Sequence, residues 1–142
     1  MFQRMTLIGR VGQDPTMRYT PDGVPVTNFS VATTETVSKA KVENCPTGWK
    51  ESYNGKNWEQ TTWFRVTCWR KLAEAVNQYL EKGSQVFVEG RLSGESDNGT
   101  LNPRVWTGKD GEAHASFELT ASTVKFLGGR SEGGAPIGDE PP

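Results

Sequence analysis

Two tryptophans flank an arginine in the segment 61–69, TTWFRVTCW. In a strand, successive side chains point to opposite faces. One face of this segment then carries Trp63, Arg65, Thr67 and Trp69, and the other carries Thr62, Phe64, Val66 and Cys68. Exposed aromatic rings beside a cation suit a ligand with flat bases and phosphates. The strand alone equally allows a second interpretation, in which a loop or a partner subunit buries the two indoles.

The composition indicates a single domain. A chain of 142 residues can bury one good core, and its 16 glycines and 8 prolines fit short strands joined by turns. No apolar run approaches the roughly 18 residues of a membrane span, and the N-terminal segment MFQRMTLIGRVG does not resemble a signal peptide. We therefore expect a cytoplasmic protein with no membrane partner, in which Cys45 and Cys68 are free thiols.

The net charge of −1 is not that of a protein that holds duplex DNA by charge alone. The charge is uneven, because residues 128–142 hold one arginine against Glu132, Asp139 and Glu140, which leaves +1 on residues 1–127. Such a body can still bind nucleic acid if its basic residues gather on one face. We expect a folded domain over residues 1–127 and a disordered, Gly/Pro-rich, weakly acidic tail over residues 128–142.

The order of predicted elements indicates the fold. Strands are predicted at 5–11, 24–34, 61–69, 84–92 and 115–127, with a short extra piece at 16–19. A helix is predicted at 71–82, ended by Gly83. Gly9 marks a bulge or a close backbone approach in the first strand, and Gly90 marks a second kink in the fourth long strand. The stretches 35–60 and 93–103 read as loops, the first with a hairpin around Asn54-Gly55.

This order predicts an all-β protein with an OB-fold. An OB-fold is a five-stranded Greek-key barrel, and its single helix lies between strands 3 and 4. Glycine kinks in the first and fourth long strands suit a small, strongly coiled barrel. Other small barrels have similar element orders, so the order alone does not distinguish them.

The sequence offers little for catalysis. His114 is the only histidine and falls in a polar turn, and with two cysteines it does not make a four-ligand zinc site. We find no nucleophile set, no paired carboxylates and no GxxxxGK loop. The chain is therefore predicted to be non-catalytic, with no metal and no cofactor.

Several strings carry a family resemblance: IGRVGQDPTMRYTPDG, NFSVATTE, TTWFRVTCWRKLAE, YLEKGSQVFVEGRL and VKFLGGR. In this order, from about Arg4 to Arg130, they resemble the bacterial and organellar single-stranded DNA-binding protein (SSB) family. The resemblance implies an OB-fold, a homotetramer, and binding of single-stranded DNA (ssDNA) with little sequence preference. It also implies recruitment of replication and repair proteins through an acidic tail.

The resemblance implies roles for nine residues of this chain. Stacking aromatics of the family fall on Trp63, Trp69 and Trp106. Basic phosphate contacts fall at or near Arg65, Lys71, Lys82, Arg104, Lys39 and Lys41. A further family tryptophan aligns near Val37, where this chain has none; Trp49 and Trp58 follow in the enlarged loop without a motif to assign them. Residues 94–103 align as an insertion.

The C-terminal segment departs from the family. Family tails end in acidic residues, a hydrophobic residue, proline and phenylalanine, whereas this segment ends IGDEPP. The resemblance therefore does not support tail-mediated recruitment of partners here. The sequence predicts an ssDNA-binding protein of replication, recombination and repair in the cytoplasm, associated with the nucleoid. An organelle or a virus-infected cell stays open as its location. The alternative is an OB-fold interaction module of the replication machinery that binds DNA weakly.

Overall fold

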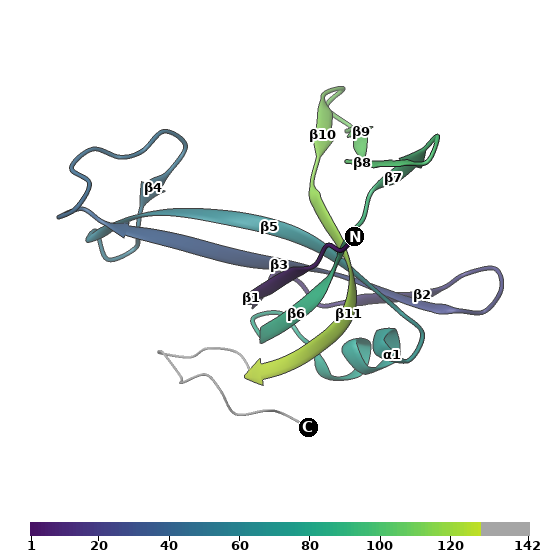
Figure 1. Ribbon diagram of the computed structural model, residues 1–142. Helices are drawn as coiled ribbons and strands as arrows, with labels where there is room; N and C mark the ends of the chain where they lie inside the picture. Colours follow the sequence, from purple (N-terminus) through teal and green to yellow (C-terminus); the bar gives the residue numbers. More distant parts are fainter. Residues whose placement is uncertain (129–142) are drawn as a thin grey trace.

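Five strands close into a barrel in the computed structural model, which describes residues 1–128 (Figure 1). They are β1 (Met5–Val11), β3 (Pro25–Ser38), β5 (Asn57–Trp69), β6 (Gln85–Leu92) and β11 (Phe117–Gly128). Neighbours follow the order β3-β1-β6-β11-β5, and β5 pairs back with β3 to close the ring. The β5–β11 pairing is parallel and the other four are antiparallel. The predicted OB-fold is confirmed.

The single helix of the described residues, α1 (Arg70–Tyr79), connects β5 to β6 and lies at the lower end of the barrel (Figure 1). It is anchored to β3 because the buried Thr27 hydroxyl donates to the Ala73 carbonyl at 2.7 Å. The helix ends three residues before the predicted Lys82. Leu80 already has extended backbone and is buried in the core. The prediction of Gly83 as the residue that ends the helix was wrong, because the helix already ends at Tyr79. Gly83 instead lies in the turn that follows, with a φ of +89°. The described residues contain no helix long and apolar enough to cross a membrane.

The core is aliphatic and lies inside the barrel, closed by α1. Its fully buried members come from every barrel strand except β1, and from the helix: Val26, Val31, Val66, Cys68, Ala73, Val76, Val86, Val88 and Leu119. Both predicted glycine positions prove to be close backbone approaches. A Cβ built on Gly9 meets the Ala32 carbonyl of β3, and one built on Gly90 meets the Thr120 carbonyl of β11.

Three ribbons extend from the barrel (Figure 1). β2 (Thr16–Tyr19) pairs with the start of β3, on the right of the view. On the left, β3 and β5 stay paired out to Ser38 and Asn57, and β4 (Lys50–Glu51) pairs with β5 around the expected hairpin at Asn54-Gly55. The predicted loop 35–60 therefore contains strand at both of its ends and at β4, with turns and irregular segments between them.

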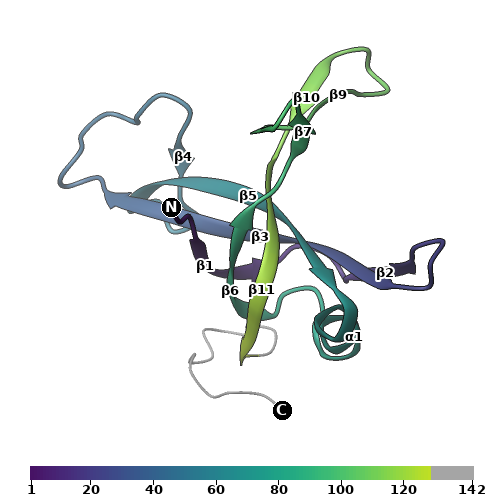
Figure 2. The same ribbon diagram turned by 45° about the vertical axis from the view of Figure 1, so that its right-hand side comes forward.

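The third projection, at the top, holds two hairpins between β6 and β11, and Figure 2 shows it from a second side. They are β7 (Glu95–Asp97) with β8 (Thr100–Asn102), and β9 (Val105–Thr107) with β10 (Ala113–Ala115). The prediction of a loop over 93–103 was wrong. Asn98 and Gly99 have φ values of 50° and 77°, which suit a two-residue hairpin turn.

The predicted tail began at Gly128, which is the last residue of β11. The rest of that tail, residues 129–142, lies outside the described residues.

Candidate functional site

The outer face of β5 carries the residues expected from the sequence. Trp63 is 53% exposed and Trp69 45% exposed, and Arg65 lies exposed between them. On the opposite face, Val66 and Cys68 are fully buried. Burial raises the pKa of the Cys68 thiol to about 12, so this free cysteine is an uncharged core residue at neutral pH. The division of β5 into two faces is confirmed.

Arg65 is one of three arginines that line a cavity of about 290 Å³. Arg18 reaches it from β2 and Arg104 from the segment before β9, and Trp106 also contributes to its wall. The Arg18 guanidinium donates to the Asn28 side-chain carbonyl. Arg18 was not among the site residues expected from the sequence, because only the pairing of β2 with β3 brings it beside Arg65.

One carboxylate lies among these arginines. Glu118 pairs with Arg65 in the β5–β11 register, and its side chain is 11% exposed. The Arg104 Nε atom lies 3.3 Å from Glu118 Oε2. The cavity therefore holds three guanidinium groups against one carboxylate, and its excess positive charge favours an anion such as phosphate.

Trp106 lies on the β9–β10 hairpin and is backed by a histidine. The Trp106 and His114 rings are stacked, with centroids 5.9 Å apart and an interplanar angle of 29°. His114 Nε2 lies 3.1 Å from Asp110 Oδ1, which also accepts the Glu112 backbone N–H. These two contacts, the Glu112 one first, hold the pKa of Asp110 below its ordinary value. His114 thus has a structural partner on each side, whereas no role for it was expected from the sequence.

Trp69 and Lys71 lie in a different place from the arginine cavity. Together with residues of the β2–β3 turn they line a shallow cavity of about 510 Å³. The backbone N–H of Lys82 donates to Asp14 Oδ1 at 2.8 Å. Asp14 in turn lines a cavity of about 310 Å³ with Arg18 and Arg65. Lys82 therefore lies next to this cavity, because Asp14, in the loop after β1, contacts it.

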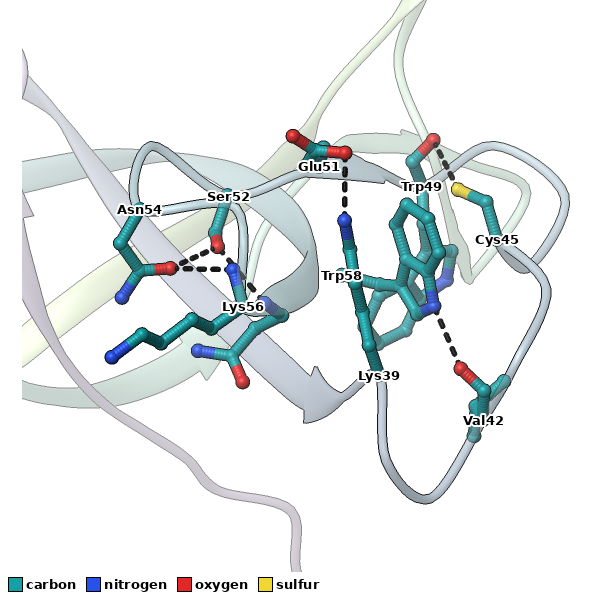
Figure 3. Close-up of polar contacts among 10 residues, drawn as sticks. Lys39, Val42, Cys45, Trp49, Glu51, Ser52, Asn54, Lys56 and Trp58 are labelled. Carbon is teal, nitrogen blue, oxygen red and sulfur yellow. Dashed lines mark hydrogen bonds and ion pairs between the residues drawn. The ribbon is translucent and has the colours of Figure 1, made fainter.

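Lys39 has partners of its own at the end of the β3–β5 ribbon (Figure 3). Its Nζ atom lies 2.7 Å from Glu51 Oε2 and 4.4 Å from the centroid of the Trp58 ring. The Trp58 indole donates to the Val42 carbonyl at 2.9 Å. A phosphate contact by Lys39 would have to compete with Glu51. Lys41 is exposed in the adjoining turn.

Trp58 lies close to the position near Val37 where the family has a tryptophan and this chain has none. The β3–β5 register places Trp58 directly opposite Val37, so the two side chains share one face of the ribbon. An indole is therefore present one strand away from the expected position. The sequence could not show this, because it required the ribbon to stay paired beyond Thr34.

The structure thus brings together four of the nine residues named by the resemblance, in or beside one surface: Trp63, Arg65, Arg104 and Trp106. It places Trp69 with Lys71 at one end of β5, and Lys39 with Lys41 at the other. Within residues 1–128, no group of three or more His, Cys, Asp or Glu side chains is arranged to hold a metal ion.

Comparison with known proteins gives a consistent family. The model of the single-strand binding protein family matches residues 2–127. Two curated relatives, each named single-stranded DNA-binding protein, come from Neisseria meningitidis serogroup A (Z2491) and serogroup B (MC58). Each is 42% identical over 135 residues, which is 94% of this chain and 65% of the relative's length. The chain thus spans somewhat less than two thirds of these relatives.

Among solved structures, a chain from a Plasmodium falciparum SSB complex with ssDNA superposes with a TM-score of 0.61. The match covers 89% of this chain and 96% of that one, at 24% sequence identity. At this identity the likeness supports the fold.

Proposed function

This chain belongs to the single-strand binding protein family, and we propose that it binds single-stranded DNA without reading its sequence. In this proposal, bases stack on Trp63, Trp69 and Trp106, and phosphates pair with the arginines between them. The observation that carries it is the outer face of β5, where two half-exposed indoles flank Arg65 beside Arg18 and Arg104. Aromatic rings accept any base, whereas the arginines accept the backbone common to all sequences.

The energetics fit a strand held at several points. Stacking contributes about 1–3 kcal/mol per base, and each neutralised phosphate releases counterions, which makes the affinity salt-dependent. Lys71, Lys82, Lys39 and Lys41 would extend the phosphate path toward both ends of β5. We propose that the protein covers ssDNA during replication, recombination and repair in the cytoplasm, associated with the nucleoid, as a binding protein that performs no catalysis.

We expect a long oligo-dT to quench the intrinsic fluorescence. Three of the five tryptophans lie on the proposed surface, and stacked bases change indole emission. The measurement is a titration at low salt with folding checked by circular dichroism. An unchanged spectrum would remove this surface as the DNA site, and would favour the alternative of an interaction module that binds DNA weakly.

We expect Gly12→Ala to weaken ssDNA binding with little effect on folding. A Cβ at Gly12 would collide with the Trp63 ring, at 2.9 Å from Cη2 and closer to Cζ3. The ring is half exposed and can move, so the added methyl should displace the platform rather than the barrel. Oligo-dT affinity and a thermal melt measure the two effects. Gly128→Ala, where the new methyl meets no atom of residues 1–128 within 4 Å, is the control.

We also propose that the chain assembles as a homotetramer. The family resemblance suggests it, and the outer face of β1 supports it, because Ile8 is 55% exposed beside Phe87 of β6. Several copies would present several sites to one strand and raise the overall affinity. Light scattering at micromolar concentration measures the mass directly, and a monomer at that concentration would contradict the proposal.

A further inference from the structure

One edge of β5 is open over a short stretch. β4 pairs with Trp58 and Glu59, and β11 begins its pairing at Phe64. Between them, residues 60–63 have a neighbouring strand on the β3 side alone, among the residues that the structure describes. An open edge presents backbone N–H and C=O groups that water or a ligand must satisfy.

A cavity of about 630 Å³ lies at this opening, within the range of about 300–1,000 Å³ usual for small-molecule sites. We call it the Trp63–Phe117 cavity. β5 and the connections between the hairpins and β11 supply its lining, which is Gln60, Thr61, Thr62, Trp63, Pro103, Ala115, Ser116 and Phe117. Figures 1 and 2 both show β10 rising from the start of β11 beside β5.

Packing in the barrel core does not account for an aromatic residue at position 117, because most of the Phe117 side chain is exposed. It is 63% exposed, and its ring contacts Phe64 with centroids 5.8 Å apart at an angle of 37°. An exposed aromatic side chain costs solvation free energy unless a ligand or partner covers it. Phe117 belongs to none of the nine residues named by the family resemblance.

The lining indicates which part of a nucleic acid would fit. None of its eight residues is charged, so it offers nothing to pair with phosphate. It has two aromatic rings, and its Gln, Thr and Ser side chains can donate to or accept from the edge of a base. Arg65 follows Trp63 on the same face of β5, roughly 7 Å further along the strand, where it can reach the adjoining phosphate.

We propose that the Trp63–Phe117 cavity binds one nucleobase of the single strand, with Phe117 as an additional aromatic contact. This rests on the proposed function, and it adds a base site to a surface whose other cavity is built for phosphate. The open edge of β5 gives the base hydrogen-bonding groups that do not depend on its identity, because backbone N–H and C=O groups offer a donor and an acceptor side by side.

The test compares Phe117→Ala with the wild-type chain on two probes, oligo-dT and an abasic oligodeoxynucleotide of the same length. The variant should bind oligo-dT roughly 5- to 150-fold more weakly, the stacking contribution of one base, and should bind the abasic probe as the wild type does. Phe117→Tyr keeps a ring and should bind oligo-dT normally. Tyr79→Ala, which removes a 49% exposed aromatic from α1, is the matched control and should change neither affinity.

Phe117→Leu keeps an apolar contact with Phe64 but removes the ring, so it replaces the alanine variant if that one does not fold. If Phe117→Ala, or Phe117→Leu in its place, bound oligo-dT as tightly as the wild type does, the base site would be overturned and the proposed function would stand. No binding of oligo-dT by the wild type would instead overturn the proposed function. A lower mass of the variant in light scattering, with unchanged oligo-dT affinity, would assign the cavity to a contact between copies of the chain and overturn the proposal.

Discussion

Replacing Trp63 or Trp69 by alanine is expected to weaken ssDNA binding by about 1–3 kcal/mol each, with little change in the free energy of unfolding. Both indoles are about half exposed on the outer face of β5, so their removal leaves no hole in the core. The loss corresponds to roughly 5- to 150-fold in Kd. Titrations with labelled oligo-dT and thermal melts of the same preparations measure the two quantities.

Val66→Ala is the matched control, since Val66 is fully buried on the opposite face of the same strand. It should lower the free energy of unfolding by about 2 kcal/mol and leave the affinity of the folded protein unchanged. Phe64 is a weaker control than its core-face position suggested, because it is only partly buried. If Trp63→Ala unfolded the domain and Val66→Ala spared it, the assignment of the two faces would be inverted.

The two faces of β5 could be predicted because the alternation of side chains is a local property of any strand. The stretch TTWFRVTCW separates into one set with two indoles and a guanidinium and a second, mainly apolar set without reference to the rest of the chain. The close approach at Gly9 was predictable for a similar reason, since a glycine inside a strand pattern signals a bulge or a close backbone approach, whereas Gly90 was predicted only as a kink. Together with the order of the strands and the helix, these local signals predicted a small barrel, and the family resemblance distinguished the OB-fold from other small barrels.

The errors arose where the strands are exposed on both faces. β7 and β8, with sequences ESD and TLN, are exposed throughout and show no alternation. The Asn98-Gly99 turn between them was the one available signal. The helix end was missed because the burial of Leu80 in the barrel outweighed the helical pattern that continues to Lys82.

The missing members of the site depend on pairing between distant segments. Arg18 reaches Arg65 only through the β2–β3 register, and Phe117 reaches the open edge of β5 only through the parallel β5–β11 register. Lys39 was predicted as a phosphate ligand, but the β4–β5 hairpin supplies Glu51 as its ion-pair partner. A single sequence contains no local pattern for such pairings.

Gly90→Ala is expected to lower the free energy of unfolding by roughly 2–4 kcal/mol, and the melting temperature by roughly 10 °C. The added Cβ would collide with the Thr120 carbonyl and lie 2.8 Å from Ala121 Cα. Both are backbone atoms of β11, so no side chain can move aside. Relief requires β6 and β11 to separate where Gly90 pairs with Ala121, next to the register shift between Ala121 and Thr123.

Gly128→Ala at the end of β11 separates this collision from the general effect of replacing a glycine. Among the residues that the structure describes, its new methyl meets nothing within 4 Å, and the change should stay within about 0.5 kcal/mol. Urea unfolding of both variants gives the two free energies. Because the Gly90 contact lies between β6 and β11 and not on the β5 face, the folded variant should bind oligo-dT like the wild type. A Gly90→Ala variant as stable as the wild type would show that the two strands do not approach this closely at Gly90.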